Sequence, residues 1–222
     1  QEGEAAELSS LGGILRRVDT GYEVTRIYQN DPDFPNRLAP IARPGVDVKV
    51  GDVITAIDGR SVTGVVHINT LLLNKAGRQT LLTTTRRGIA GERKFIVRPL
   101  SHADFRSLKL SDWEYTRRQE TENRSNGQIG YFHMRAMSTG NFSEFVKGFY
   151  PVFNRQGLII DMRQNYGGNI DSWILGRLMR KAWMYWQGRS GEPYSNMHYA
   201  FNGHMVVLID AYTISDGEAF SE

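Results

Sequence analysis

The chain of 222 residues contains no cysteine, and this absence excludes several kinds of chemistry at once. Without cysteine there is no disulfide framework, no thiolate nucleophile and no cysteine-based zinc site. Such a composition fits the reducing cytoplasm, where disulfides are rare. We therefore expect a cytoplasmic protein, with an exported one as the open alternative.

Long apolar runs and a strong net charge are missing as well. No apolar stretch has the length of about 18 residues that a bilayer requires, so we expect no membrane span. The formal net charge is only +3, and the basic residues occur in short clusters such as Arg86-Arg87. Nucleic-acid-binding domains usually gather their basic residues on one face. We therefore expect neither a membrane nor a nucleic acid as a partner.

Residues 10–98 alternate short strands with turns, a pattern typical of a β-rich domain. The loop Leu11-Gly12-Gly13-Ile14 leads into the first strand, and Asp58-Gly59 is expected to form a tight hairpin turn. Further strands are expected at residues 22–27, 53–57, 80–85 and 94–97, and a helix at 67–75. These elements contain enough apolar residues for a compact core of their own.

Residues 99–112 are expected to form a polar connector, after which the pattern changes. Residues 157–162 and 205–209 are almost entirely apolar, as in strands buried on both faces. A strand is also expected at 128–134, with helices at 141–150 and after residue 169, the latter capped by Asn169 or Asp171. This strand–helix alternation indicates a parallel α/β layer over residues 113–222. The fold class is therefore α+β with two domains.

Ser215 lies where the apolar strand at 205–209 should turn sharply into a helix. The neighbouring strand at 157–162 ends in the bare glycine turn Gly167-Gly168. Acyl transfer requires such an exposed nucleophile and unobstructed N–H groups facing the developing oxyanion. A lone serine in this position is more often a helix N-cap, and a glycine pair is often only a tight turn. Their combination favours the catalytic interpretation.

Several other polar and aromatic residues are candidates for a functional role. Asp161 and Asp210 end strands and could resemble metal ligands, but capping of turns or pairing with Arg163 is the favoured interpretation. We expect no metal and no cofactor. His204 is a candidate base only if the chain folds back, because a strand spans about 3.3 Å per residue. The three tryptophans expected to pack in the core or in an interface are Trp173, Trp183 and Trp186.

Two groups of motifs resemble known families. The loop at residues 11–14 and the run from Pro44 to Gly59 resemble a PDZ domain of the protease-associated bacterial type. The run at 158–168 and the motif Thr213-Ile-Ser-Asp-Gly-Glu218 resemble the C-terminal processing peptidases of family S41, specifically their tricorn-protease-like branch. The resemblance extends from about residue 11 to residue 222.

The resemblance implies a serine endopeptidase that cleaves peptides or unfolded chains and works as a homo-oligomer. It implies a PDZ domain over residues 10–98, followed by a layered ClpP/crotonase-like core that is truncated at its C-terminus. The nucleophile position falls on Ser215. The oxyanion donors fall on the backbone N–H groups of Asp216 and Gly167. The pattern departs at Tyr166, where tricorn-like sequences usually have glycine.

Two further expectations concern the missing base and the PDZ loop. The resemblance implies a general-base histidine before the PDZ domain or a lysine well after the serine, both outside this chain. The isolated chain is therefore expected to be nearly inactive. The N–H groups of Leu11, Gly12, Gly13 and Ile14 are expected to receive a peptide carboxylate. The alternative function is a non-catalytic PDZ peptide-binding module on an inactive protease core.

Overall fold

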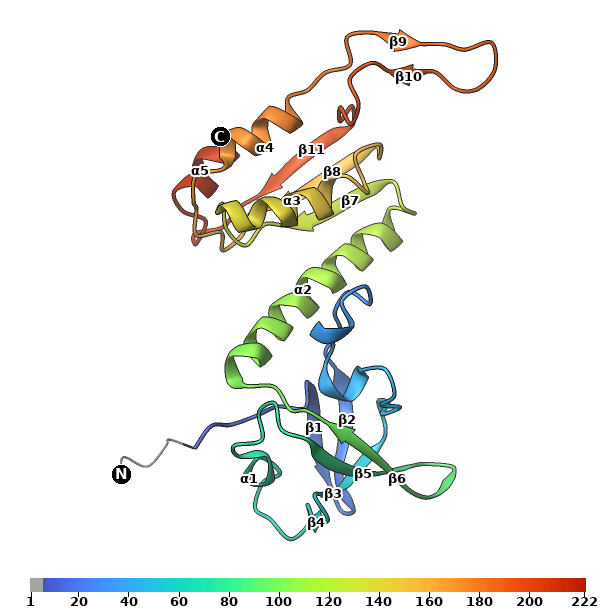
Figure 1. The fold of residues 1–222 in the computed structure, drawn as a ribbon, viewed down its shortest axis with the longest axis vertical. Helices are drawn as coiled ribbons and strands as arrows, with labels where there is room; N and C mark the ends of the chain where they lie inside the picture. The colour runs from blue at the N-terminus through green and yellow to red at the C-terminus, as the bar shows by residue number, and fades with distance from the viewer. Residues whose placement is uncertain (1–5) are drawn as a thin grey trace. The chain divides into compact units, whose positions relative to one another are not determined.

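The computed structural model describes residues 6–222 and divides into two compact units after Tyr115 (Figure 1). The first unit is β-rich, and the second combines strands and helices. This confirms the α+β class predicted from the strand and helix patterns. Within residues 6–222, no helix has the length and apolar character needed to cross a bilayer.

The first unit is built on one antiparallel sheet of six strands. Its order is β1-β2-β3-β5-β6, with β4 paired to β3, so β1 lies at an edge. The strands are β1 (Gly13–Val18), β2 (Gly21–Ile27), β3 (Val53–Ile57), β4 (Arg60–Ser61), β5 (Thr80–Arg86) and β6 (Ile89–Val97). The short helix α1 (Asn69–Leu72) contributes Leu71 and Leu72 to a core shared with the sheet. Two 3-10 helices, η1 (Pro35–Arg37) and η2 (Pro40–Ala42), lie between β2 and β3.

A buried ion pair joins a turn of the first unit to its sheet. Asp52 is only 1% exposed, and Arg86 on β5 donates to its carboxylate from Nε at 2.7 Å and from Nη2 at 2.8 Å. The Lys49 N–H donates to the same carboxylate at 2.9 Å. Burial disfavours the charged form of Asp52, but the hydrogen bonds from Arg86 and Lys49 outweigh it and hold the pKa of Asp52 below its usual range. The ionised carboxylate is therefore part of the folded structure.

The segment expected to be a polar connector, residues 99–112, is largely helical. Helix α2 (His102–Arg124) begins after Ser101, whose hydroxyl accepts the Asp104 N–H at 3.1 Å. Only two of its residues are buried, Leu108 and Asp112. Asp112 accepts hydrogen bonds from the Arg26 guanidinium at 2.5 Å and from the Gln29 N–H at 2.6 Å. A non-local polar anchor thus holds a helix whose sequence carries little apolar periodicity.

The second unit contains the parallel layer that the apolar runs predicted. The central strand β8 pairs in parallel with both β7 and β11. The strands are β7 (Ile129–His133), β8 (Gly157–Asp161) and β11 (His204–Leu208), with helices α3 (Phe142–Phe149), α4 (Asp171–Leu178) and α5 (Asp216–Ser221) and one 3-10 helix, η3 (Thr139–Asn141). Gly148 lets α3 approach the sheet, because a Cβ there would lie 2.5 Å from Cγ of Phe132.

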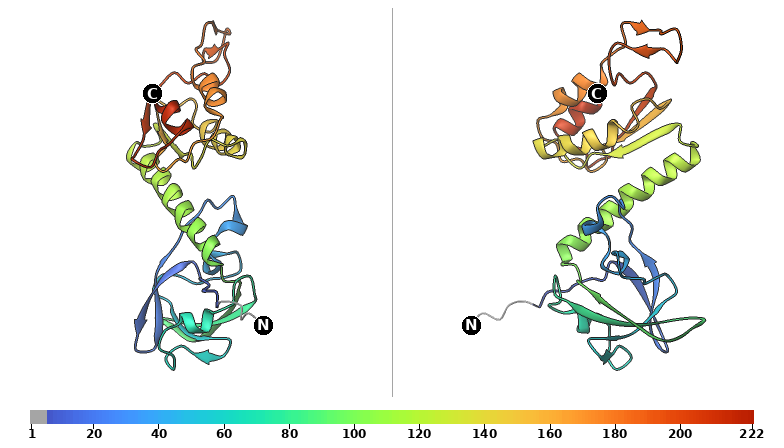
Figure 2. Two further views of the ribbon diagram at one scale, coloured as in Figure 1. Left: turned by 90° about the vertical axis from the view of Figure 1, so that its left-hand side faces the viewer. Right: turned by 45° about the vertical axis from the view of Figure 1, so that its right-hand side comes forward.

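A hairpin of β9 (Tyr185–Trp186) and β10 (Tyr194–Ser195) extends away from this sheet (Figure 1, Figure 2). The exposure of three tryptophans shows that the core alternative of their predicted packing is wrong, whereas packing in an interface stays a prediction. Trp183 and Trp186 are 68% and 50% exposed, and Trp173 on α4 is 53% exposed, so none of the three is a core residue of this unit. Aromatic character alone does not distinguish a buried side chain from one on an extended hairpin.

The Asp52–Arg86 pair yields a stability prediction. Asp52→Asn should lower the free energy of unfolding by about 2 kcal/mol, because it removes the buried carboxylate that accepts two hydrogen bonds from the partly buried Arg86 guanidinium. Asp47→Asn is the matched control, since Asp47 contacts the same arginine but is half exposed, and it should cost clearly less than Asp52→Asn. Urea unfolding followed by fluorescence measures both. Equal losses for the two variants would contradict the account.

The same pair sets a dependence on pH. A carboxylate whose folded pKa is depressed stabilises the fold above the unfolded pKa of about 4, and this contribution is lost as pH falls through the folded pKa. The difference in stability between the unsubstituted chain and Asp52→Asn should therefore be full at pH 6 and shrink as the pH is lowered below about 4. A difference that stays constant down to pH 2 would show that ionisation of Asp52 is not its source.

Candidate active site

Ser215 occupies a strained backbone position between β11 and α5. It is the residue immediately before the first turn of α5, with φ 54° and ψ −127°. Non-glycine residues rarely adopt this conformation, which costs on the order of 1–3 kcal/mol. The side chain is exposed, and within residues 6–222 its hydroxyl has no hydrogen-bond partner. A sharp strand-to-helix turn that presents a free serine hydroxyl is the geometry of a nucleophile elbow.

Asp210 holds the loop that leads into this elbow. Its Oδ1 accepts the backbone N–H groups of Gln164 and Tyr212, each at 3.0 Å. These backbone hydrogen bonds, with that from Gln164 the largest influence, hold the pKa of Asp210 below its usual range. Thr213 adds a second tie, since its hydroxyl donates to the Met162 carbonyl at 2.9 Å. Asp210 thus caps turns and joins two loops, as the favoured interpretation predicted.

Asn165 organises the glycine turn on the other side of Ser215. Its buried side chain accepts the Gly167 N–H at Oδ1 and donates from Nδ2 to the Met134 carbonyl, both at 2.8 Å. Its backbone carbonyl accepts the Ile214 N–H at 3.0 Å. Asn165 therefore connects the glycine turn both to the sheet and to the residue before Ser215. This role was not predicted from the sequence, although an asparagine two residues before a glycine is a signal for an Asx turn.

Gly167 and Ser215 are in direct contact. A Cβ on Gly167 would lie 2.6 Å from Cβ of Ser215 and 3.0 Å from the Asp216 nitrogen. Gly167 also has φ 77°, which disfavours any residue with a side chain. A Cβ on Gly168 would lie 1.9 Å from the Met137 carbonyl oxygen, so this position also excludes side chains. The structure thus brings together the serine and the glycine turn that the sequence singled out.

The N–H groups near Ser215 differ in their availability. The Gly167 N–H already donates to Asn165, so it can serve an oxyanion only by sharing that hydrogen bond. Among the described residues, the N–H groups of Asp216 and Gly168 have no acceptor. Of the two donors expected from the sequence, Asp216 is therefore the available one, and Gly168 offers a second free N–H in the same turn.

The Asp216 side chain caps α4, a role that was not predicted from the sequence. Its Oδ2 accepts the N–H groups of Ile170 and Asp171 at 3.0 and 3.2 Å. Of the two expected caps, Asp171 contributes, since its Oδ1 accepts the first-turn N–H of Ser172 at 2.6 Å, whereas within residues 6–222 the Asn169 side chain makes no such bond. A carboxylate near the first N–H groups of a helix stabilises it wherever it lies in the sequence. The residue after the proposed nucleophile therefore fixes a second helix.

A buried network lies at the end of β8, where the glycine loop begins. Asp161 is fully buried and accepts Arg163 Nη2 at 2.6 Å and the Tyr131 hydroxyl at 2.7 Å. Burial opposes its ionisation, but the hydrogen bonds from Arg163 and Tyr131 prevail and lower the pKa of Asp161. Burial and the neighbouring carboxylate raise the pKa of the Tyr131 hydroxyl far above its usual value. Asp161 thus pairs with Arg163 as the favoured interpretation predicted.

The histidine weighed as a resident base lies at the wrong end of the sheet. His204 opens β11 and is paired with Gly157 at the start of β8, whereas Ser215 follows the far end of β11. The five-residue strand alone separates its two ends by about 13 Å at 3.3 Å per residue. His133 is at the correct end, but its Nε2 lies 2.8 Å from the Arg163 carbonyl oxygen. The geometry therefore gives no support to His204 as base.

Comparisons with known proteins match a different protein family to each of two parts of the chain. Residues 11–102 match the family model of the tricorn protease PDZ domain, and residues 128–222 match that of peptidase family S41. Tricorn protease homologues of Streptomyces coelicolor and Saccharolobus solfataricus are 30% and 32% identical over 97% and 98% of this chain. The crystal structure of the tricorn protease matches 97% of the chain with a TM-score of 0.85 and 28% identity. The chain covers 20% of each homologue and 21% of that structure.

The strain at Ser215 predicts an unusual gain of stability on substitution. Ser215→Gly should raise the free energy of unfolding by about 1 kcal/mol relative to Ser215→Ala, because glycine adopts this backbone conformation without steric cost. The expected gain is the strain energy that glycine relieves, minus the free-energy cost that arises because glycine has more conformational entropy in the unfolded chain. Thermal unfolding of both variants measures the difference. A glycine variant no more stable than the alanine variant would show that Ser215 is not strained.

Proposed function

We propose a peptidase function for this chain, which belongs to the tricorn-protease-like branch of peptidase family S41 and carries a PDZ domain ahead of its core. The proposed activity is that of a serine endopeptidase acting on peptides or unfolded chains. One observation carries the proposal most directly: an exposed serine in a strained elbow lies against a glycine turn. Strain of this kind is retained where function requires it.

In the proposed mechanism, Ser215 Oγ attacks the scissile carbonyl carbon while a base takes its proton. The carbonyl oxygen becomes an oxyanion, which accepts hydrogen bonds from the Asp216 N–H and from the glycine turn, at Gly167 as expected or at the unoccupied Gly168 N–H. Each such donor typically contributes about 3 kcal/mol to stabilisation of the transition state. The protonated base then gives its proton to the leaving nitrogen, so that collapse of the intermediate expels the amine and leaves an acyl-enzyme on Ser215, which water hydrolyses.

The base is proposed to come from outside this chain. Within residues 6–222 no side chain is hydrogen-bonded to the Ser215 hydroxyl, and a serine without a base is a weak nucleophile at neutral pH. The chain covers between 18% and 25% of the length of curated tricorn-like relatives. We therefore assign the complete activity to the whole protein, for which a homo-oligomer and a cytoplasmic location are part of the same proposal.

A second proposed function is peptide binding by the PDZ domain, independent of catalysis. It is favoured by the edge position of β1, because an extended peptide can add to the free side of such a strand. The loop that leads into β1 packs closely against the rest of the unit. Leu11 is buried, and Gly12 has φ 79° and lies against Ala39. Leu11 to Ile14 are proposed as the peptide-binding residues. If catalysis is absent, this activity remains as the alternative function.

Hydrolysis of a fluorogenic peptide tests the peptidase proposal. In the whole protein, Ser215→Ala should lower turnover by more than about 10³-fold, because the nucleophile is lost. Ser221→Ala is the matched control on the same helix, where the Ser221 hydroxyl already donates to the Gly217 carbonyl at 2.8 Å, and it should leave turnover nearly unchanged. Residues 1–222 alone should be nearly inactive.

Two outcomes of this experiment would overturn parts of the proposal. Turnover by the whole protein that survives Ser215→Ala would remove Ser215 as nucleophile. Serine-dependent turnover by residues 1–222 alone, at a rate similar to that of the whole protein, would show that the base lies within this chain.

A further inference from the structure

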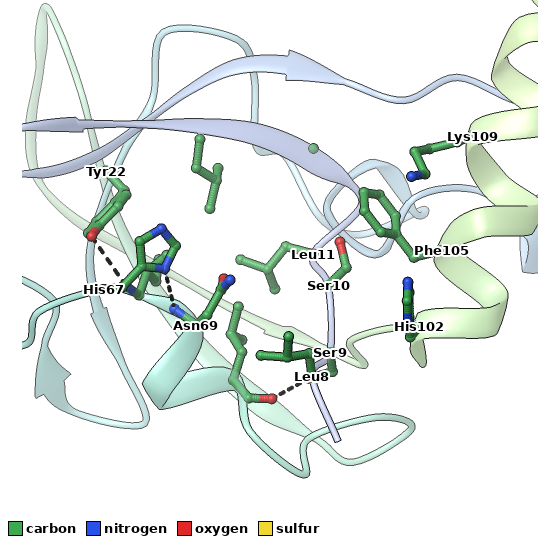
Figure 3. A pocket seen from close by; sticks show the side chains of 14 residues that line it. Leu8, Ser9, Ser10, Leu11, Tyr22, His67, Asn69, His102, Phe105 and Lys109 are labelled. Atoms are coloured by element: carbon green, nitrogen blue, oxygen red, sulfur yellow. Dashed lines mark hydrogen bonds between the residues drawn. The ribbon is translucent and has the colours of Figure 1, made fainter. Parts of the chain in front are cut away.

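A cavity of about 320 Å³ lies in the first unit between β1, α1 and the beginning of α2 (Figure 3). Its floor is apolar, formed by Leu11 and Leu15 from the edge strand region and by Ile68 and Leu72 from the α1 region. This volume is at the lower end of the range for ligand sites and suits one apolar side chain with part of its backbone. The proposed peptide loop thus borders a cavity that can take an apolar residue.

The third wall of this cavity belongs to α2, outside the sheet and α1. His102, Phe105 and Lys109 all line it from the first two turns of this helix. In Figure 3 they lie on the side facing Leu11 and Ser10. The helix is held against the first unit at Asp112, one turn beyond Lys109, by Arg26 and the Gln29 N–H. These side chains are therefore presented to the cavity by an anchored element.

The charge of the lining favours an anionic ligand. No aspartate or glutamate lines the cavity, whereas Lys109, His67 and His102 do. Lys109 Nζ lies 5.1 Å from the centre of the Phe105 ring and has no ion-pair partner among the described residues. A cation with no carboxylate partner, next to an apolar cavity, is complementary to a group that joins an apolar side chain to a negative charge.

The backbone N–H groups of the loop at residues 11–14 are not sufficient to bind a peptide carboxylate by themselves. The Gly12 N–H, one of the donors expected for a peptide carboxylate, already donates to the Ser10 hydroxyl at 3.1 Å. Gly12 also does not line the cavity, whereas Leu11 and Gly13 on either side of it do. A carboxylate bound here therefore requires a further donor, and Lys109 is a long flexible side chain with three N–H groups at the same cavity.

We propose that the beginning of α2 is part of the peptide site, which takes the C-terminus of a peptide that ends in an apolar residue. Lys109 pairs with the terminal carboxylate, and Phe105 packs beside the terminal side chain in the apolar cavity. This inference deepens the peptide-binding function proposed above for Leu11 to Ile14 and rests on it. It makes α2 a ligand-binding element rather than only a connection between the two units.

Fluorescence polarisation with labelled hexapeptides tests the proposal. The protein is the 222-residue chain carrying Ser215→Ala, so that the measurement does not depend on hydrolysis. One peptide ends in leucine with a free carboxylate, the second is its C-terminal amide, and the third is the amide with an internal aspartate. We expect the free acid to bind about tenfold more tightly than either amide, since charge-assisted hydrogen bonds exceed neutral ones.

Substitution of Lys109 identifies the residue that recognises the charge. Lys109→Ala should weaken binding of the free acid about five- to tenfold and leave binding of the amide unchanged, whereas Lys109→Arg should retain most of the affinity. Arg106→Ala, on the same helix but not lining the cavity, is the matched control and should have no effect on the affinity.

Three outcomes would overturn the inference. In the first, the protein that retains Lys109 does not bind the free-acid peptide. In the second, Lys109→Ala weakens binding of the free acid and of the amide equally. In the third, the amide with an internal aspartate binds as tightly as the free acid. Because Ser215 is absent throughout, failure of the peptidase proposal does not affect this test. Conversely, failure of peptide binding here leaves the hydrolysis experiment unaffected.

Discussion

The close contact between the Gly167 backbone and Ser215 is the constraint on which the second unit's site depends. It requires glycine at position 167 and places Ser215 in a backbone conformation that non-glycine residues avoid. Such a conformation persists only if the surroundings over-determine it. Three polar side chains constrain the surroundings of Ser215. Asp210 joins the loop before Ser215 to the loop after β8, Asn165 holds the glycine turn, and Asp216 caps α4. The ties of Asp210 and Asp216, and that of Asn165 to the Met134 carbonyl, cross between segments that are far apart in the sequence.

The first unit uses the same physical device for a different purpose. Asp52 and Asp112 are both buried carboxylates that are paired with arginine and accept backbone N–H groups. Removal of one partner from such a group leaves an uncompensated buried charge, so these contacts specify geometry strongly. Asp112 fixes the position of α2, and thereby the position of the residues that face the apolar cavity. Polar anchors thus place both the serine elbow and the proposed peptide site.

Much of the second unit could be predicted from the sequence because its strands β8 and β11 are largely apolar runs. The parallel layer of β7, β8 and β11 and the turn after Leu208 followed from those runs. Helix α2 could not be predicted in this way, because its stabilisation comes from Asp112 and not from an apolar stripe. The cap of α4 escaped prediction for the same reason, since Asp216 lies 46 residues from Ile170. Local patterns reveal strands and turns, whereas contacts between distant polar groups become visible only in the folded chain.

A crystal structure of the protein with a peptidyl boronic acid tests the central claim most directly, because boron adds to a nucleophilic serine and forms a tetrahedral adduct. We predict a covalent bond between boron and Ser215 Oγ, with one boronate oxygen within about 3 Å of the Asp216 nitrogen. The Ser215 backbone should keep its positive φ in the adduct. Boron bound to another residue, or an adduct whose oxygens all point away from the Asp216 N–H, would contradict the account.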